Sequence, residues 1–156
     1  MTIHVKTACK VGLWLAILTF TSCSTNRQTM KQVIYTPNAP APIGPYSQAT
    51  SAGGFVFISG QIAIDPATGN MYTGGDIATE TRQVMENLKA IVLESGHTMQ
   101  DILKCTIFLR NMQDFAAVNA VYGEYFPEYP PARETVAVAG LPKNAGVEIS
   151  AIVSAK

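Results

Sequence analysis

The chain has 156 residues, and 47% of them are hydrophobic, enough to bury the core of one domain. Eleven Lys and Arg balance eleven Asp and Glu, so the formal net charge is zero, and the basic residues form no run. Proteins that bind nucleic acid normally carry a cationic patch, so this balance argues against that class without excluding a small groove.

The N-terminus has the pattern of a secretory signal. Lys6 and Lys10 precede an apolar run, residues 11–20, and small residues ending on Cys23 follow. Such a run of about ten residues is typical of signal peptides and too short for a bilayer, which takes about twenty. Because the small residues end on cysteine, the pattern resembles a bacterial lipobox. Cleavage would leave Cys23 as the new N-terminus, with lipid on its thiol.

We therefore expect a signal peptide over residues 1–22, a lipid-anchored polar tether over residues 23–30 and a folded domain over residues 31–156. Without Lys6 and Lys10, nine basic residues face eleven acidic ones, a net charge of about −2. The protein would be extracytoplasmic, held by lipid at a bacterial membrane on its periplasmic side. The alternative is an ordinary secreted protein in which Cys23 is coincidental.

Strands are expected before the first helix. Residues 31–36 predict a short strand, and the four prolines of residues 37–46 exclude a helix because proline fixes φ and lacks an amide donor. Residues 47–52 and 55–62 predict a hairpin around Gly53-Gly54.

Two helices and three further strands follow. Asp76 is a suitable N-cap, apolar residues then recur at three- and four-residue steps as far as Val92, and Gly96 ends the helix. Asp114 is expected to cap a second helix that Pro127 ends. The remaining strands are predicted at residues 102–109, 135–138 and 147–153.

The predicted order is therefore β-β-β-α-β-α-β-β, in which two helices can cover only one face of the sheet. Residues 55–58 show no polar alternation, which is typical of strands covered on both faces, and residues 102–109 are likewise expected to be covered on both faces. We infer that a partner subunit covers the second face, since exposed apolar sheet favours association.

Few residues offer chemistry. Apart from His4 in the leader, the chain has one histidine, His97, and it has no Cys/His pair with zinc spacing and no phosphate-loop motif. We therefore expect no metal site and no phosphate-binding loop. Cys105 lies in the apolar run and is interpreted as a buried structural cysteine, with a reactive thiol as the alternative.

Arg133 and Glu148 are the strongest candidates. Arg133 follows two prolines at the expected mouth of a strand, and its planar guanidinium suits a carboxylate. Glu148 lies between two apolar residues and faces away from them, where half-burial can raise its pKa and let it exchange protons with water. The alternative for both is a surface or interface ion pair.

Several motifs in order resemble those of the RidA/YjgF family of enamine/imine deaminases, also called the L-PSP endoribonuclease family. The resemblance spans about residues 34–152. It rests on residues 41–48 (APIGPYSQ), 58–61 (ISGQ), 114–119 (DFAAVN), 131–133 (PAR), 141–143 (LPK) and 147–149 (VEI).

This resemblance implies a chorismate-mutase-like α+β fold, a six-stranded sheet with two helices on one face, and a homotrimer with sites between subunits. The implied reaction is hydrolysis of 2-aminoacrylate and related 2-imino acids to 2-keto acids and ammonia, without a cofactor. The implied roles are carboxylate binding for Arg133 and orientation or activation of water for Glu148. The substrate-binding residues implied by the motifs are Tyr46, Ser59, Gly60, Asn119 and Thr135, the last replacing a cysteine found in many members.

Two other functions stay open. The same pocket could bind a small carboxylate without turnover, or the chain could cleave RNA. A simple hairpin of the last two strands would also place Arg133 well over 10 Å from Glu148. Either these strands do not pair, or residues of different subunits share a site.

Overall fold

The computed structural model describes residues 30–72 and 75–155. The predicted signal peptide and the lipidation of Cys23 lie outside these residues, as does all of the predicted tether except Met30. Within them, none of the helices is long and apolar enough to span a bilayer.

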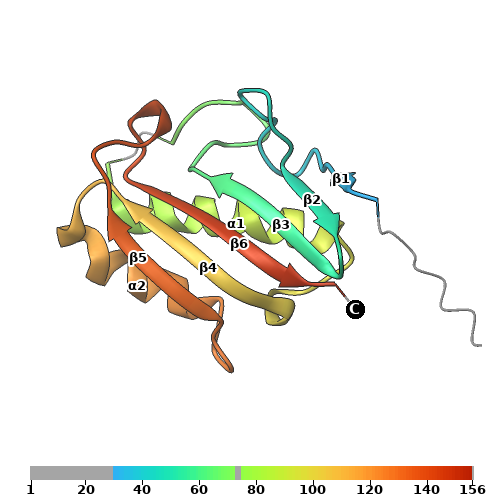
Figure 1. Cartoon of the computed structure of the whole chain (residues 1–156). Helices are drawn as coiled ribbons and strands as arrows, with labels where there is room; N and C mark the ends of the chain where they lie inside the picture. The colour runs from blue at the N-terminus through green and yellow to red at the C-terminus, as the bar shows by residue number, and fades with distance from the viewer. Residues whose placement is uncertain (1–29, 73–74, 156) are drawn as a thin grey trace, which may run out of the picture.

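The described residues form six strands and two α-helices in the predicted order (Figure 1). The elements are β1 (Gln32–Ile34), β2 (Ala49–Ala52), β3 (Phe55–Gln61), α1 (Ile77–Glu94), β4 (Ile102–Leu109), α2 (Phe115–Glu124), β5 (Ala132–Ala137) and β6 (Val147–Ser154). Short 3-10 turns occupy Met99–Asp101, Met112–Asp114 and Pro142–Asn144. Both α-helices lie on one face of the sheet, as expected (Figure 1).

The strands lie in the order β1-β2-β3-β6-β4-β5. All neighbours are antiparallel except β4 and β5, which are parallel. A parallel pair needs a crossover connection, and α2 provides it. Because β4 lies between β5 and β6, the last two strands are not hairpin partners.

Helix α1 forms as its sequence predicts. The Asp76 carboxylate accepts a hydrogen bond from the Ala78 amide at 3.0 Å, which satisfies one free donor of the first turn. Val84, Leu88 and Ile91 are fully buried against the sheet at three- and four-residue steps.

Helix α2 ends before Pro127, as predicted, but begins differently from the prediction. Asp114 ends a 3-10 turn with helical backbone angles and makes no capping hydrogen bond through its side chain. The Asn111 side chain instead accepts from the Gln113 amide one turn earlier. The helix stops at Glu124, before Pro127. The Asp114 cap was wrong because an N-cap normally needs an extended backbone.

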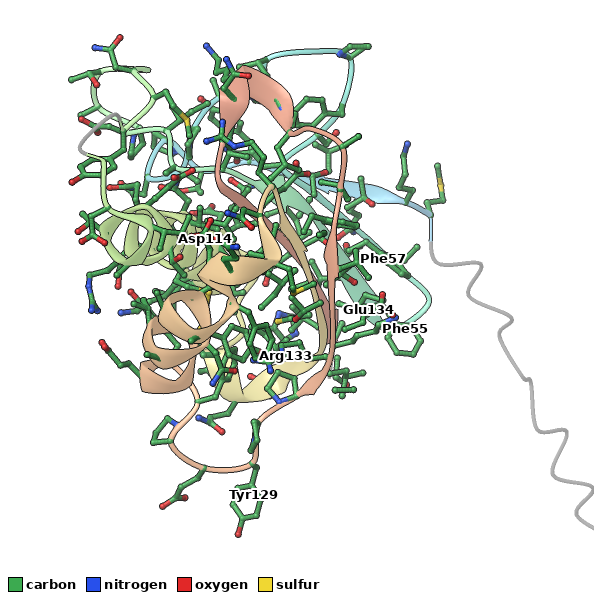
Figure 2. All side chains as sticks on the ribbon, turned by 90° about the vertical axis from the view of Figure 1, so that its left-hand side faces the viewer. Phe55, Phe57, Asp114, Tyr129, Arg133 and Glu134 are labelled. Atoms are coloured by element: carbon green, nitrogen blue, oxygen red, sulfur yellow. The ribbon has the colours of Figure 1, made fainter. Side chains whose placement is uncertain are left out.

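The sheet has a covered face and an open face. Alternate residues of β4 and β6, such as Ile107 and Ile149, are buried under the helices. On the opposite side, Phe55 and Phe57 are 42% and 47% exposed, and Val136 is 43% exposed. Figure 2 shows the two phenylalanines on the side away from the helices. Within a single chain, the helices therefore cover only one face of the sheet, although apolar side chains lie on both faces.

Candidate functional site

Glu148 lies on the open face of β6, beside a bulge in β3. Ile58 pairs with Ala151 and Gln61 pairs with Ile149, so β3 has one more residue than β6 between these two pairs. A Cβ added to Gly60 would lie 2.7 Å from Cδ of Glu148, closer than real Cβ atoms approach a neighbour. Gly60 therefore lets the carboxylate lie against the β3 backbone, and any side chain there would displace it.

The Glu148 carboxylate is half-buried, and burial raises its pKa, as the sequence analysis expected. Among the described residues it forms no ion pair and no hydrogen bond, so the ion-pair alternative is not found within one chain. A carboxylate that is poorly solvated and unpaired is a stronger base than one in water.

A cavity of about 320 Å³ opens in front of Glu148, and we call it the glutamate cavity. Its lining residues are Ile43, Tyr46, Ser59, Gly60, Ile62, Pro142 and Glu148. Three predicted binding residues, Tyr46, Ser59 and Gly60, therefore lie together with Glu148. The Ser59 hydroxyl donates to the Ser47 carbonyl at 2.7 Å, so toward a ligand it can only accept.

Gln48 holds the proline-rich segment that carries Tyr46. Its side chain is buried and makes four hydrogen bonds to backbone groups of Thr36, Ala39 and Pro40, at 2.7–3.1 Å. Sequence reasoning gave Gln48 no role, although a polar residue directly before a strand, next to a loop in which four prolines lack amide donors, was a visible signal.

The start of β6 is held by a second contact that no sequence signal indicates. The Glu80 carboxylate, in the first turn of α1, accepts a hydrogen bond from the Gly146 amide at 2.6 Å. Gly146 lies two residues before Glu148, so this bond fixes the strand end that presents the candidate base.

Arg133 lies on the other side of the sheet, facing α2 (Figure 2). It is the second residue of β5, because this strand begins at Ala132 rather than at the predicted residue 135. Its Nη1 donates to Oδ1 of Asn119 at 2.8 Å. Its Cζ lies 4.9 Å from the ring centroid of Tyr122 and 5.8 Å from that of Phe115. Residues 115, 119 and 122 share one face of α2, which thus holds the guanidinium by an amide and two rings.

A second cavity, of about 400 Å³, lies beside this guanidinium, and we call it the arginine cavity. It is lined by Asn119, Tyr122, Gly123, Phe126, Pro130, Pro131 and Arg133. No carboxylate of the described residues pairs with Arg133. Asn119 accepts from one guanidinium N–H group, and the others can bind a carboxylate.

Thr135 and Cys105 lie on the same face of the sheet as Arg133. The register of β4 and β5 places Cys105 opposite Arg133, and Thr135 follows two residues later. The Thr135 hydroxyl is buried without a hydrogen-bond partner in the described part of the chain. Cys105 is buried, as expected, and burial raises the pKa of its thiol, which favours the structural interpretation because a neutral thiol is a poor nucleophile.

One chain does not bring Arg133 and Glu148 together. On the shared neighbour β4, Arg133 lies opposite Cys105 and Glu148 lies opposite Phe108. Residues three apart on a strand face opposite sides, and three residues span about 10 Å. The predicted residues thus divide into two half-sites, one on each face of the sheet.

The fold and these motifs occur together in known proteins. The sequence model of the family described as Endoribonuclease L-PSP matches residues 36–155. The chain belongs to this family. The RidA/YjgF resemblance is thereby confirmed at the level of the family.

Relatives in this L-PSP family align with nearly their whole length. A RutC family protein of Pyrococcus horikoshii is 56% identical over 123 residues, 79% of this chain and 97% of that protein. A protein of Dermatophagoides farinae named 2-iminobutanoate/2-iminopropanoate deaminase is 52% identical over 123 residues, 79% of this chain and 95% of its own length. The crystal structure of Escherichia coli TdcF with bound serine is 41% identical, has a TM-score of 0.76 and covers 80% of this chain and 99% of its own.

Proposed function

We propose that the two half-sites of different copies meet in a homotrimer and that the completed site hydrolyses 2-aminoacrylate-like enamines and 2-imino acids. The products are a 2-keto acid and ammonia, and no cofactor takes part. The observation that carries this proposal is the division of the candidate residues between two cavities on opposite faces. A base without a substrate anchor and an anchor without a base are each incomplete, and a second copy supplies the missing half.

The open face supports association. It presents Phe55, Phe57 and Val136 to solvent in a single chain. Apolar side chains gathered on one face favour burial against another molecule. Lys104 and Glu134 on the same face pair at 3.0 Å, and the Thr106 hydroxyl donates to Glu134 at 3.0 Å, so these two charges already have partners.

In the proposed reaction, Arg133 holds the substrate carboxylate through paired hydrogen bonds. Water adds its oxygen to the electrophilic imine carbon while Glu148 takes one proton from it and passes that proton to the nitrogen. Glu148 then moves the hydroxyl proton of the resulting carbinolamine to the same nitrogen. The C–N bond breaks, C=O forms and ammonia leaves, so the imine and one water become the keto acid and ammonia.

Little further machinery is needed. An imine carbon is already electrophilic, so holding water and substrate together provides most of the acceleration. The relative named as a deaminase supports this chemistry. The TdcF structure with serine supports a small amino-acid-like carboxylate as the ligand class.

The test is keto-acid release from 2-iminobutanoate, with the full chain and with a form lacking residues 1–23. We expect turnover that Arg133→Ala and Glu148→Gln each abolish. A parent protein that leaves the spontaneous rate unchanged would contradict the proposal.

Binding without turnover is the second candidate, favoured by the serine bound to TdcF. In that case Arg133 suffices and Glu148 is dispensable. Calorimetry with 2-keto acids distinguishes the two functions. Unchanged affinity in Glu148→Gln, together with no turnover in the parent, would select the binding function.

The extracytoplasmic, lipid-anchored location is also a proposal. It rests on the pattern of residues 1–23 alone. Membrane fractionation tests it: the parent should pellet with membranes, and Cys23→Ser should not carry lipid. Recovery of an uncleaved parent in the cytoplasm would contradict it.

A further inference from the structure

The arginine cavity continues past Arg133 along an apolar wall. Phe126, Pro130 and Pro131 line it together with the ring of Tyr122. Its volume of about 400 Å³ falls within the range of about 300–1,000 Å³ typical of ligand pockets. Within a single chain, a three- or four-carbon acid held at Arg133 would leave most of this space unfilled.

Gly123 keeps one side of the cavity open. It lies in the last turn of α2, directly after Tyr122, and lines the cavity. A Cβ added there would meet no heavy atom within 4 Å. Glycine weakens a helix relative to alanine, so the absence of a side chain at this position has a cost in helix stability and leaves the cavity unobstructed.

We propose that Gly123 determines substrate specificity by keeping space for an apolar substrate side chain. The substrate class is then 2-imino acids with branched aliphatic or aromatic side chains, rather than the three- and four-carbon compounds alone. This inference rests on the proposed function, because it takes Arg133 as the anchor of the substrate carboxylate.

The geometry of such a substrate fits the lining. The side chain branches from the carbon next to the carboxylate, so a carboxylate at the guanidinium directs the side chain along the same cavity. Phe126, Pro130 and Pro131 offer it apolar contacts, while Asn119 keeps its hydrogen bond to Arg133. Each buried methylene then favours the longer substrate roughly fourfold in kcat/KM.

The experiment compares two substrates on the full chain: 2-iminobutanoate and the 2-imino acid derived from leucine. The variants are Gly123→Ala, Gly123→Leu and, as a matched control, Ala120→Leu. Ala120 is an exposed residue of α2 outside the cavity lining, so its variant adds the same bulk without narrowing the cavity.

We expect the parent to prefer the leucine-derived substrate. Gly123→Leu should lower the ratio of kcat/KM for that substrate to kcat/KM for 2-iminobutanoate at least tenfold, while Ala120→Leu should leave this ratio unchanged. Gly123→Ala should keep or raise the melting temperature, because alanine favours helix, while it narrows the cavity. A lower kcat/KM of this variant for the larger substrate therefore does not result from a folding defect.

The outcomes separate the two proposals. A parent that hydrolyses only the small substrate, or a Gly123→Leu variant that treats both substrates as the parent does, overturns the inference and leaves the deaminase function standing. A parent that hydrolyses neither overturns the deaminase function. In that case, calorimetry with the two matching 2-keto acids tests the inference. If Gly123→Leu binds only the larger acid more weakly than the parent does, the inference is supported. If both proteins bind the larger acid equally, or neither binds it, the inference is overturned.

Discussion

The two cavities position their key groups in different ways. In the glutamate cavity the Glu148 side chain has no bonded partner among the described residues, and space left by Gly60 and the β3 bulge determines where it lies. In the arginine cavity Arg133 is held by direct contacts from Asn119, Tyr122 and Phe115. One group is therefore placed by the absence of a side chain and the other by the presence of three. Substitutions in the two cavities should therefore impair activity in different ways.

The largest expected effect tests whether the two cavities belong to one site. Arg133→Ala and Glu148→Gln should each lower kcat/KM at least about a hundredfold, because each removes a group that acts in the transition state. Co-assembly of the two inactive proteins should restore activity. With random mixing, about a quarter of the sites would receive Arg133 and Glu148 intact from neighbouring copies.

The measurement is deaminase activity after the two variants are unfolded together and refolded. The control is a mixture of each variant refolded separately, which should stay inactive. Failure of the co-refolded mixture, when its oligomeric state matches the parent, would show that Arg133 and Glu148 do not act across a shared interface.

The next prediction concerns placement by space. Gly60→Ala would force its Cβ onto the Glu148 side chain, so the carboxylate or the β3 backbone has to move. We expect kcat to fall at least tenfold and the free energy of unfolding to fall by about 1–3 kcal/mol. Gly140→Ala is the control, because a Cβ there meets no atom within 4 Å. A Gly60→Ala variant with parental kcat would mean that the position of Glu148 is not critical.

Local patterns predicted the elements of this fold well, but not the relations between them. The Gly53-Gly54 hairpin and the Asp76 cap are confirmed because each is determined by a few neighbouring residues. The pairing of β6 between β3 and β4 was not predicted, since it depends on contacts between segments far apart in the sequence. The expected alternative that the last two strands do not pair is the correct one.

The candidate site follows the same division. Residue type and motif identified Arg133 and Glu148, and the alternation of β6 correctly gave Glu148 a half-buried, open-face position. The aromatic support from Phe115 and Tyr122 was missed, because their helical spacing is equally typical of core packing. Their contact with Arg133 becomes visible only from the pairing of β5 with β4, which places Arg133 on the face that the helices cover.

The third prediction concerns placement by contact. Tyr122→Leu removes the ring beneath Arg133, so the anchor becomes mobile and KM should rise roughly tenfold, from the loss of a cation–π contact of about 1–2 kcal/mol. The change in kcat should be smaller, because Glu148 is untouched. Tyr122→Phe keeps the ring and should restore KM, since the hydroxyl lies beside the Cys105 thiol and makes no hydrogen bond to Arg133. Equal KM values for Phe and Leu variants would assign Tyr122 a packing role only.

The smallest expected effect is on stability and comes from the unpaired Glu148. Burial raises its pKa in the folded state above the unfolded value of about 4.3. The folded state therefore binds more protons than the unfolded state between the two values, and stability falls as pH rises through that window. Glu148→Gln keeps the shape and removes the charge. Its melting temperature should exceed that of the parent at pH 7, and the difference should vanish below the unfolded pKa. A melting temperature of Glu148→Gln below that of the parent at pH 7 would mean that Glu148 has a stabilising partner in the assembled protein. Arg133 of a neighbouring copy would be the first candidate, and a double-mutant cycle of Glu148→Gln with Arg133→Ala would test it.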